Sequence, residues 1–142
     1  MEIEFRLAQK KFKLAGARSL FLEYVDRISK FTPCHAVELP RKNKRLGSGS
    51  KIWICNRGGR PASSEELAGQ LEKIRGSGIK QLEILIGGAS GFSKEELGQL
   101  KPNFLWSFGP LTLPHELAAV IASEQIYRAF TLINRLPYHS GH

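Results

Sequence analysis

Strand-like and helix-like segments alternate along almost the whole chain, and this alternation limits the possible folds more than any other feature. Some segments are short and apolar in blocks or at every second residue, as strands are. Others repeat apolar residues at helical spacing. The pattern predicts an α/β fold with a mostly parallel sheet and helices on both faces. The predicted strands cover residues 2–8, 35–39, 51–56, 82–86 and 104–108, and the predicted helices begin near residues 15, 63, 93 and 114.

Local signals mark where several of these elements begin and end. Ser63 to Glu66 and Ser93 to Glu96 both have the spacing of a capping box, which starts a helix. Gly58-Gly59 predicts a turn after the third strand. No linker is long enough to divide the 142 residues, so a single domain spanning 1–142 is expected.

The charge of the chain points to a polyanionic partner. Lys and Arg number 21 against 13 Asp and Glu, which gives a net charge of +8. Nucleic acid is the commonest partner of so basic a small domain, although excess cations also aid solubility. There is no run of roughly 20 apolar residues and no signal-peptide core, so no membrane association and a cytoplasmic location are expected. Cys34 and Cys55 form no C-x-x-C pair, and we expect no metal site.

Three glycines follow the fourth predicted strand directly, in the run from Leu85 to Gly91. Without side chains, such residues let the backbone turn sharply and approach a ligand closely. The run lacks the Walker lysine and the full dinucleotide fingerprint. It is compatible either with a ligand site or with a simple tight turn between strand and helix.

The segment from Trp106 to His115 is apolar and stiff, with two prolines and a glycine before a long helix. A loop of this kind is poorly suited to water. It could surround an adenine-like ring, with backbone groups bonding the base edge, or it could pack against a partner subunit.

Polar and aromatic residues gather near the C-terminus. Tyr127 and Arg128 lie about one helical turn after Glu124 and can share a polar seam. Tyr138 and His139 follow the helix and could stack on a base or contact phosphate. The alternative for these last residues is a frayed terminus.

Several of these motifs occur together in one order and spacing. They are Leu85-Ile-Gly-Gly-x-x-Gly91, Trp106-Ser, Leu111-Thr-Leu-Pro-His115, Glu124-Gln-x-Tyr-Arg128-Ala and Pro137-Tyr-His139. From about residue 79 to 139 the series resembles the ribosomal RNA large subunit methyltransferase H family. The resemblance implies a SPOUT methyltransferase fold with a C-terminal trefoil knot. It also implies a homodimer that uses S-adenosylmethionine to methylate N3 of a pseudouridine in 23S rRNA, within the ribosome.

The resemblance also assigns residues to the site. The expected cofactor-binding residues are Cys55, Gly87, Gly88, Phe108, Gly109, Pro110, Leu111, Thr112 and Leu113. The expected substrate-facing, catalytic residues are His115, Arg128, Tyr138 and His139. In this scheme His115 or His139 accepts the N3 proton, since a neutral imidazole is available near pH 7. Arg128 holds phosphate or favours the deprotonated base.

The chain departs from the family pattern in places. Asn56 stands where an Asp is usual and Ser90 where a Glu is usual, and the stretch 41–50 is a short basic loop in place of a helix. These changes leave open a non-catalytic RNA- or ribosome-binding protein of the same fold. A nucleotide-binding regulatory protein, supported only by the glycines, is a third alternative.

Overall fold

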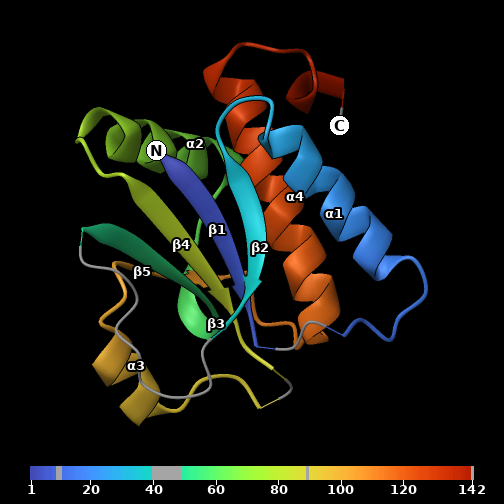
Figure 1. Cartoon of the computed structure of the whole chain (residues 1–142), viewed down its shortest axis with the longest axis vertical. Coiled ribbons are helices and arrows are strands. Elements are labelled where there is room, and N and C mark those ends of the chain that lie inside the picture. Colours follow the sequence, from blue (N-terminus) through green and yellow to red (C-terminus); the bar gives the residue numbers. More distant parts are fainter. Residues whose placement is uncertain (9–10, 40–48, 89, 142) are drawn as a thin grey trace.

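The protein is described by a computed structural model, which covers residues 1–8, 11–39, 49–88 and 90–141 (Figure 1). Five parallel strands form one sheet in the order β2-β1-β4-β3-β5. This confirms the predicted α/β fold with a parallel sheet. The strands are β1 (Glu2–Leu7), β2 (Cys34–Glu38), β3 (Ser50–Pro61), β4 (Gln81–Ile86) and β5 (Phe104–Ser107).

The helices gather mainly on one face of the sheet, which differs from the expected sharing between two faces. Residues of α1, α2 and α4 join the inward-facing residues of the strands in one hydrophobic cluster. By contrast, α3 buries none of its residues and lies beyond the end of the sheet (Figure 1). The helices are α1 (Ala17–Ile28), α2 (Ser64–Gly76), α3 (Lys94–Leu100) and α4 (His115–Ile133), followed by a short 3-10 turn, His139–Gly141.

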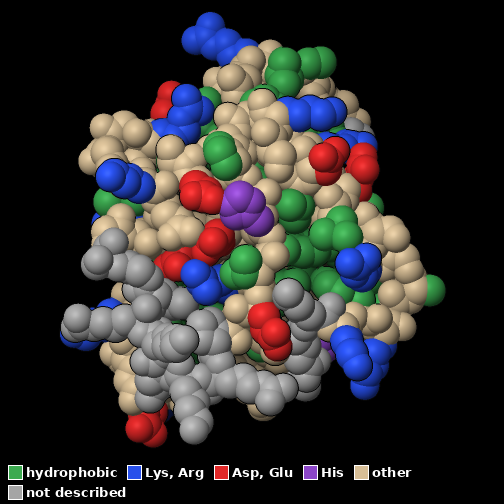
Figure 2. Space-filling view, in the orientation of Figure 1, with side chains coloured by type: hydrophobic (Ala, Val, Ile, Leu, Met, Phe, Trp, Pro, Cys, Tyr) green, Lys and Arg blue, Asp and Glu red, His purple; other side chains and the backbone are tan. Residues whose placement is uncertain are grey.

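The strand register explains which side chains form the core. Ile3, Phe5 and Leu7 of β1 lie beside the alternate residues of β4, and all are buried under the helices. The intervening residues of β1 face the other way, where acidic side chains and a histidine lie together in the middle of Figure 2. There Arg6 bonds both Glu4 and the buried Glu83, at 2.8 and 3.1 Å.

The strand β3 is longer than predicted, and the prediction of a turn at Gly58-Gly59 is wrong. The strand continues to Pro61, with an irregularity in its pairing to β5 between Cys55 and Arg60. A Cβ atom on Gly59 would lie 2.4 Å from the backbone oxygen of Leu105. The glycine is therefore needed for the close approach of two strands, a role that a sequence pattern cannot separate from a turn.

Both predicted capping boxes are confirmed. Ser63 and Ser93 each accept a hydrogen bond from the backbone N–H of the glutamate three residues later, and each glutamate bonds back to the serine N–H. Among the described helices, none is long and apolar enough to cross a membrane.

Candidate functional site

A cavity of about 750 Å³ opens where β4 and β5 reach their carboxyl ends, beside the irregularity of β3 that begins at Cys55. In open parallel sheets this edge is the usual place for a ligand, because the loops that follow neighbouring strands meet there. The cavity brings together nine of the ten residues on this side of the molecule that the sequence predicted, and Pro110 is the one not in its wall. The nine are Cys55, Gly87, Gly88, Phe108, Gly109, Leu111, Thr112, Leu113 and His115.

The glycine turn after β4 forms one wall of the cavity. A Cβ atom on Gly87 would lie 3.0 Å from the ring of Phe92 and 3.2 Å from the Cα of Gly91. The backbone N–H of Gly91 donates to the carbonyl of Gly88 at 2.9 Å, which closes the turn. The turn is thus packed too closely to admit a side chain at Gly87.

The apolar loop after β5 forms the opposite wall and is held at two points. The Ser107 hydroxyl accepts a hydrogen bond from the N–H of Gly109 at 3.1 Å. The Arg57 guanidinium donates to the Thr112 hydroxyl at 2.8 Å. Arg57 also lines the cavity, and sequence reasoning missed it, although its place just beyond the apolar part of β3 was a signal.

Cys55 contributes an apolar surface and no nucleophile. Burial raises the pKa of its thiol, so the group stays protonated at neutral pH. A neutral thiol packs as a small apolar side chain. The predicted role as part of a binding wall suits this chemistry.

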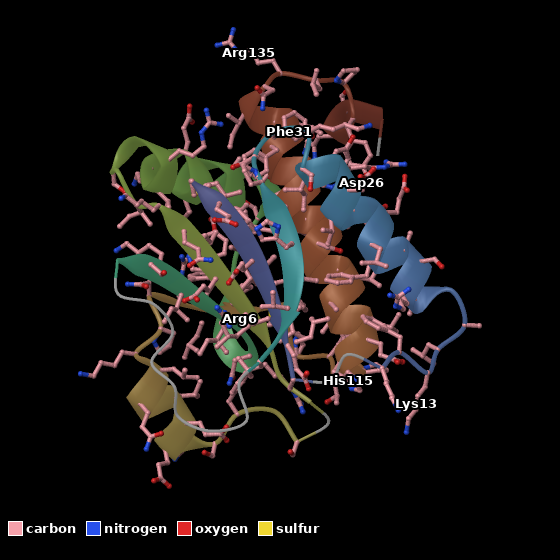
Figure 3. The ribbon with its side chains drawn as sticks, in the orientation of Figure 1. Arg6, Lys13, Asp26, Phe31, His115 and Arg135 are labelled. Atoms are coloured by element: carbon pink, nitrogen blue, oxygen red, sulfur yellow. The ribbon has the colours of Figure 1, made fainter. Side chains whose placement is uncertain are left out.

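His115 lies at the start of α4 and lines the cavity. Its Nε2 atom is buried and has no hydrogen-bond partner among the residues that the structure describes, which leaves it available to a group that enters the cavity. The neighbouring Glu116 is buried and accepts from the backbone N–H groups of Lys13 and Leu14. Figure 3 shows Lys13 beside His115 at this end of the helix. Glu116 therefore joins the segment before α1 to the wall of the cavity.

Glu116→Gln should lower the free energy of unfolding by about 1–2 kcal/mol, because the amide offers one acceptor oxygen to two backbone donors. Urea denaturation measures the change. Glu95→Gln, at an exposed first-turn position of α3, is the matched control and should change stability by less than about 0.5 kcal/mol. Equal effects of the two substitutions would show that the buried contact adds nothing.

The other three predicted catalytic residues form a cluster at the far end of α4. Arg128 bonds the Glu124 carboxylate through two nitrogens, at 2.7 and 3.0 Å. The Tyr138 hydroxyl donates to the same carboxylate at 3.0 Å, and its ring lies 4.9 Å from the Arg128 guanidinium carbon. Burial, followed by hydrogen bonds to Tyr24 and Glu124, raises the pKa of Tyr138. The residues that follow α4 are thus held in place at Tyr138 and do not form a frayed terminus.

The contacts of His139 indicate which tautomer it adopts. Arg128 lies 3.2 Å from Nδ1, and a guanidinium can only donate, so Nδ1 accepts. Nε2 lies 2.9 Å from Glu65 and therefore carries the proton that it donates. A backbone hydrogen bond and then the His139 contact hold the pKa of Glu65 below its usual value. In this arrangement His139 has no free lone pair.

The cavity and the C-terminal cluster are far apart within one chain. Arg128 lies 13 residues after His115 in the same helix, which corresponds to about 20 Å along its axis. Figure 3 shows the same separation, with His115 at one end of the molecule and Arg135, just past the helix, at the other. The structure groups His115 with the cavity, and Arg128, Tyr138 and His139 with one another.

Comparison with known proteins gives the family. A family model described as "Predicted SPOUT methyltransferase" matches residues 1–139. The ribosomal RNA large subunit methyltransferase H of Xylella fastidiosa strain M12 is 49% identical over 140 residues, covering 85% of this chain and 87% of that protein.

Two further relatives carry the same name. That of Xanthomonas oryzae pv. oryzae strain PXO99A is 36% identical over 138 residues, covering 84% of this chain and 86% of its own. The relative from Koribacter versatilis is 33% identical over 139 residues, covering 93% of this chain and 94% of that protein. The chain therefore belongs to the ribosomal RNA large subunit methyltransferase H family of SPOUT methyltransferases.

Proposed function

We propose that this protein transfers a methyl group from S-adenosylmethionine to N3 of a pseudouridine in 23S rRNA. The observation that carries the proposal is the cavity, which has a tight glycine-rich turn on one side and a stiff apolar loop on the other. Its volume of about 750 Å³ suits a nucleoside-sized ligand. When bound, S-adenosylmethionine would supply an already activated methyl group, so the chain's own task is to position the acceptor.

Gly87, Gly88 and the loop from Phe108 to Leu113 would hold this cofactor. Their backbone groups can bond the edge of an adenine, while Cys55 and Leu113 provide an apolar surface. The tight turn supports this fit, because the position of a Cβ atom on Gly87 is already taken by Phe92 and Gly91 and the backbone of the turn borders the cavity.

The acceptor nitrogen must lose its proton, and His115 is the better of the two candidate bases. Its side chain belongs to the cavity lining, and its buried Nε2 atom is without a partner in the described chain. His139 already accepts from Arg128 and donates to Glu65. We assign His139 and Tyr138 to substrate contact and Arg128 to holding phosphate or the deprotonated base.

We also propose that the protein is a homodimer and that each cavity is completed by its partner. One chain separates its cavity from its Arg128 cluster by about 20 Å along α4. Both can act on one nucleotide only if the cluster comes from a second copy. A two-fold dimer makes two such sites at once. A single domain, a C-terminal trefoil knot and a cytoplasmic location belong to the same proposal.

Gly87→Ala should weaken S-adenosylmethionine binding by about tenfold or more, since the new methyl group meets the ring of Phe92 and backbone atoms of Gly91 and so shifts the turn that forms the cavity wall. Isothermal titration calorimetry measures the change. Gly98→Ala, at an open position on α3, is the control and should bind as the unaltered protein does. Unchanged binding in both variants would contradict the proposal that the cofactor binds in this cavity.

A second candidate is a non-catalytic RNA-binding protein of the same fold. Asn56 and Ser90, which replace the acids expected from the resemblance, both line the cavity. Mass spectrometry of 23S rRNA from a strain lacking the gene separates the two functions. Loss of one methyl mark is the expected result, with restoration by the gene on a plasmid. An unchanged modification profile would favour the non-catalytic alternative.

A further inference from the structure

The edge of the sheet opposite the cavity is rich in cations. Because all strands are parallel, their amino ends meet at this edge. Lys51 lies at the start of β3, Lys80 directly before β4 and Lys101 shortly before β5. Lys73 and Arg75 lie in the last turn of α2.

Within the described chain, none of these five side chains has an acidic partner within 4.0 Å. Other described cations, such as Arg18 and Lys94, are unpaired as well, so what sets the five apart is their shared place at one edge of the sheet. Ion pairs are formed elsewhere, by Arg6, Arg27, Arg60 and Arg128. Lys73 and Arg75 also oppose the negative end of the α2 dipole, which accounts for two of the five. The three lysines at strand starts have no such explanation.

A groove of about 320 Å³ lies at this basic edge, between α2, the first residues of β3 and Asn103, which directly precedes β5. Lys51 and Lys73 belong to its lining, with Trp53 and Ile74 as apolar lining. Asn103 lines it too, and its Oδ1 accepts from the backbone N–H of Ile52 at 2.8 Å, which directs the amide.

The side chains of this groove select for a negatively charged acceptor. Lysine ammonium groups are donors without acceptor capacity. The ligand must therefore carry acceptor oxygens and negative charge, as a phosphate does. Lysine is a common point-charge contact for nucleic-acid backbones.

We propose that this groove binds the phosphate backbone of the RNA substrate, as a second contact remote from the methyl-transfer cavity. The inference rests on the proposed function for the identity of the RNA. Lys51 and Cys55 are four residues apart on β3, about 13 Å. One nucleotide cannot occupy both places, whereas a hairpin with its flanking helix can.

The test uses the full chain and an RNA hairpin of about 30 nucleotides taken from large-subunit rRNA, with fluorescence anisotropy at several KCl concentrations. The double substitution Lys51→Gln/Lys73→Gln should weaken RNA binding about tenfold at physiological salt and reduce the salt slope by about 1.5. S-adenosylmethionine affinity should stay unchanged. The control is Arg18→Gln/Lys94→Gln, which removes the same charge at exposed positions of α1 and α3.

The outcomes separate this proposal from the one on which it rests. A loss of RNA affinity and slope beyond that of the control, with normal cofactor binding, supports the groove. Equal RNA binding by the two double variants overturns the groove and leaves the methyltransferase proposal intact. Failure of the unaltered protein to bind S-adenosylmethionine overturns the proposed function itself, and RNA binding is then judged separately by the same slopes.

Discussion

Gly59→Ala is expected to destabilise the protein by about 3 kcal/mol, near the upper end for the insertion of one methyl group. The added Cβ would lie 2.4 Å from the backbone oxygen of Leu105 and 2.6 Å from its carbonyl carbon. Backbone atoms in a sheet cannot turn aside as a flexible side chain can. Relief therefore requires β3 and β5 to separate where the cavity wall begins.

Thermal unfolding followed by circular dichroism measures this effect, and a loss of about 3 kcal/mol corresponds to a midpoint lowered by about 10 °C. Gly58→Ala is the matched control, because its Cβ would meet only the side-chain oxygen of Asn56, at 3.3 Å. That variant should lose less than about 1 kcal/mol. Equal midpoints for the two variants would contradict the close packing of β3 against β5.

Gly59 also shows which features of the fold could not be predicted from the sequence. The alternation of strands and helices and the two capping boxes are local signals, and the structure confirms them. The length of β3 depends on its pairing with β5, which begins more than forty residues later. A pair of glycines has the same local pattern in a turn and in a strand approached by another backbone.

For the candidate site, too, the sequence predicted one part and could not predict another. The glycine turn and the apolar loop could be placed together from sequence, because both follow parallel strands and such loops meet at one edge. The role of Glu116 could not. An acid in the first turn of a helix is explained by the helix dipole alone, whereas its contact with Leu14 joins residues 102 positions apart.

The separation of His115 from Arg128 was contained in the sequence, since both lie in one predicted helix. What requires the structure is that the tail turns back onto the far end of α4 and not toward the cavity. The contact of Tyr138 with Glu124 and that of His139 with Glu65 of α2 hold it there. In the proposed dimer, a cluster fixed in this way serves the cavity of the other subunit.

Two inactive variants should restore activity to each other if the cavity of one subunit is completed by the other. Gly87→Val distorts the turn that forms one wall of the cavity, and Arg128→Ala removes the centre of the cluster. Each variant alone should methylate 23S rRNA at least about 100-fold more slowly than the unaltered protein. In a mixed dimer, the open cavity of the Arg128→Ala subunit faces the intact cluster of the Gly87→Val subunit.

Random mixing by co-expression makes about half of the dimers mixed, each with one working site of two, so activity should recover to about one quarter of normal. Separate affinity tags on the two chains allow the mixed dimer to be purified, and its activity should then be about half of normal. Co-expression of each variant with its own tagged copy is the control. If the mixed dimer is no more active than its parents while Arg128→Ala alone is inactive, the cluster acts within its own chain, and the composite site must be abandoned.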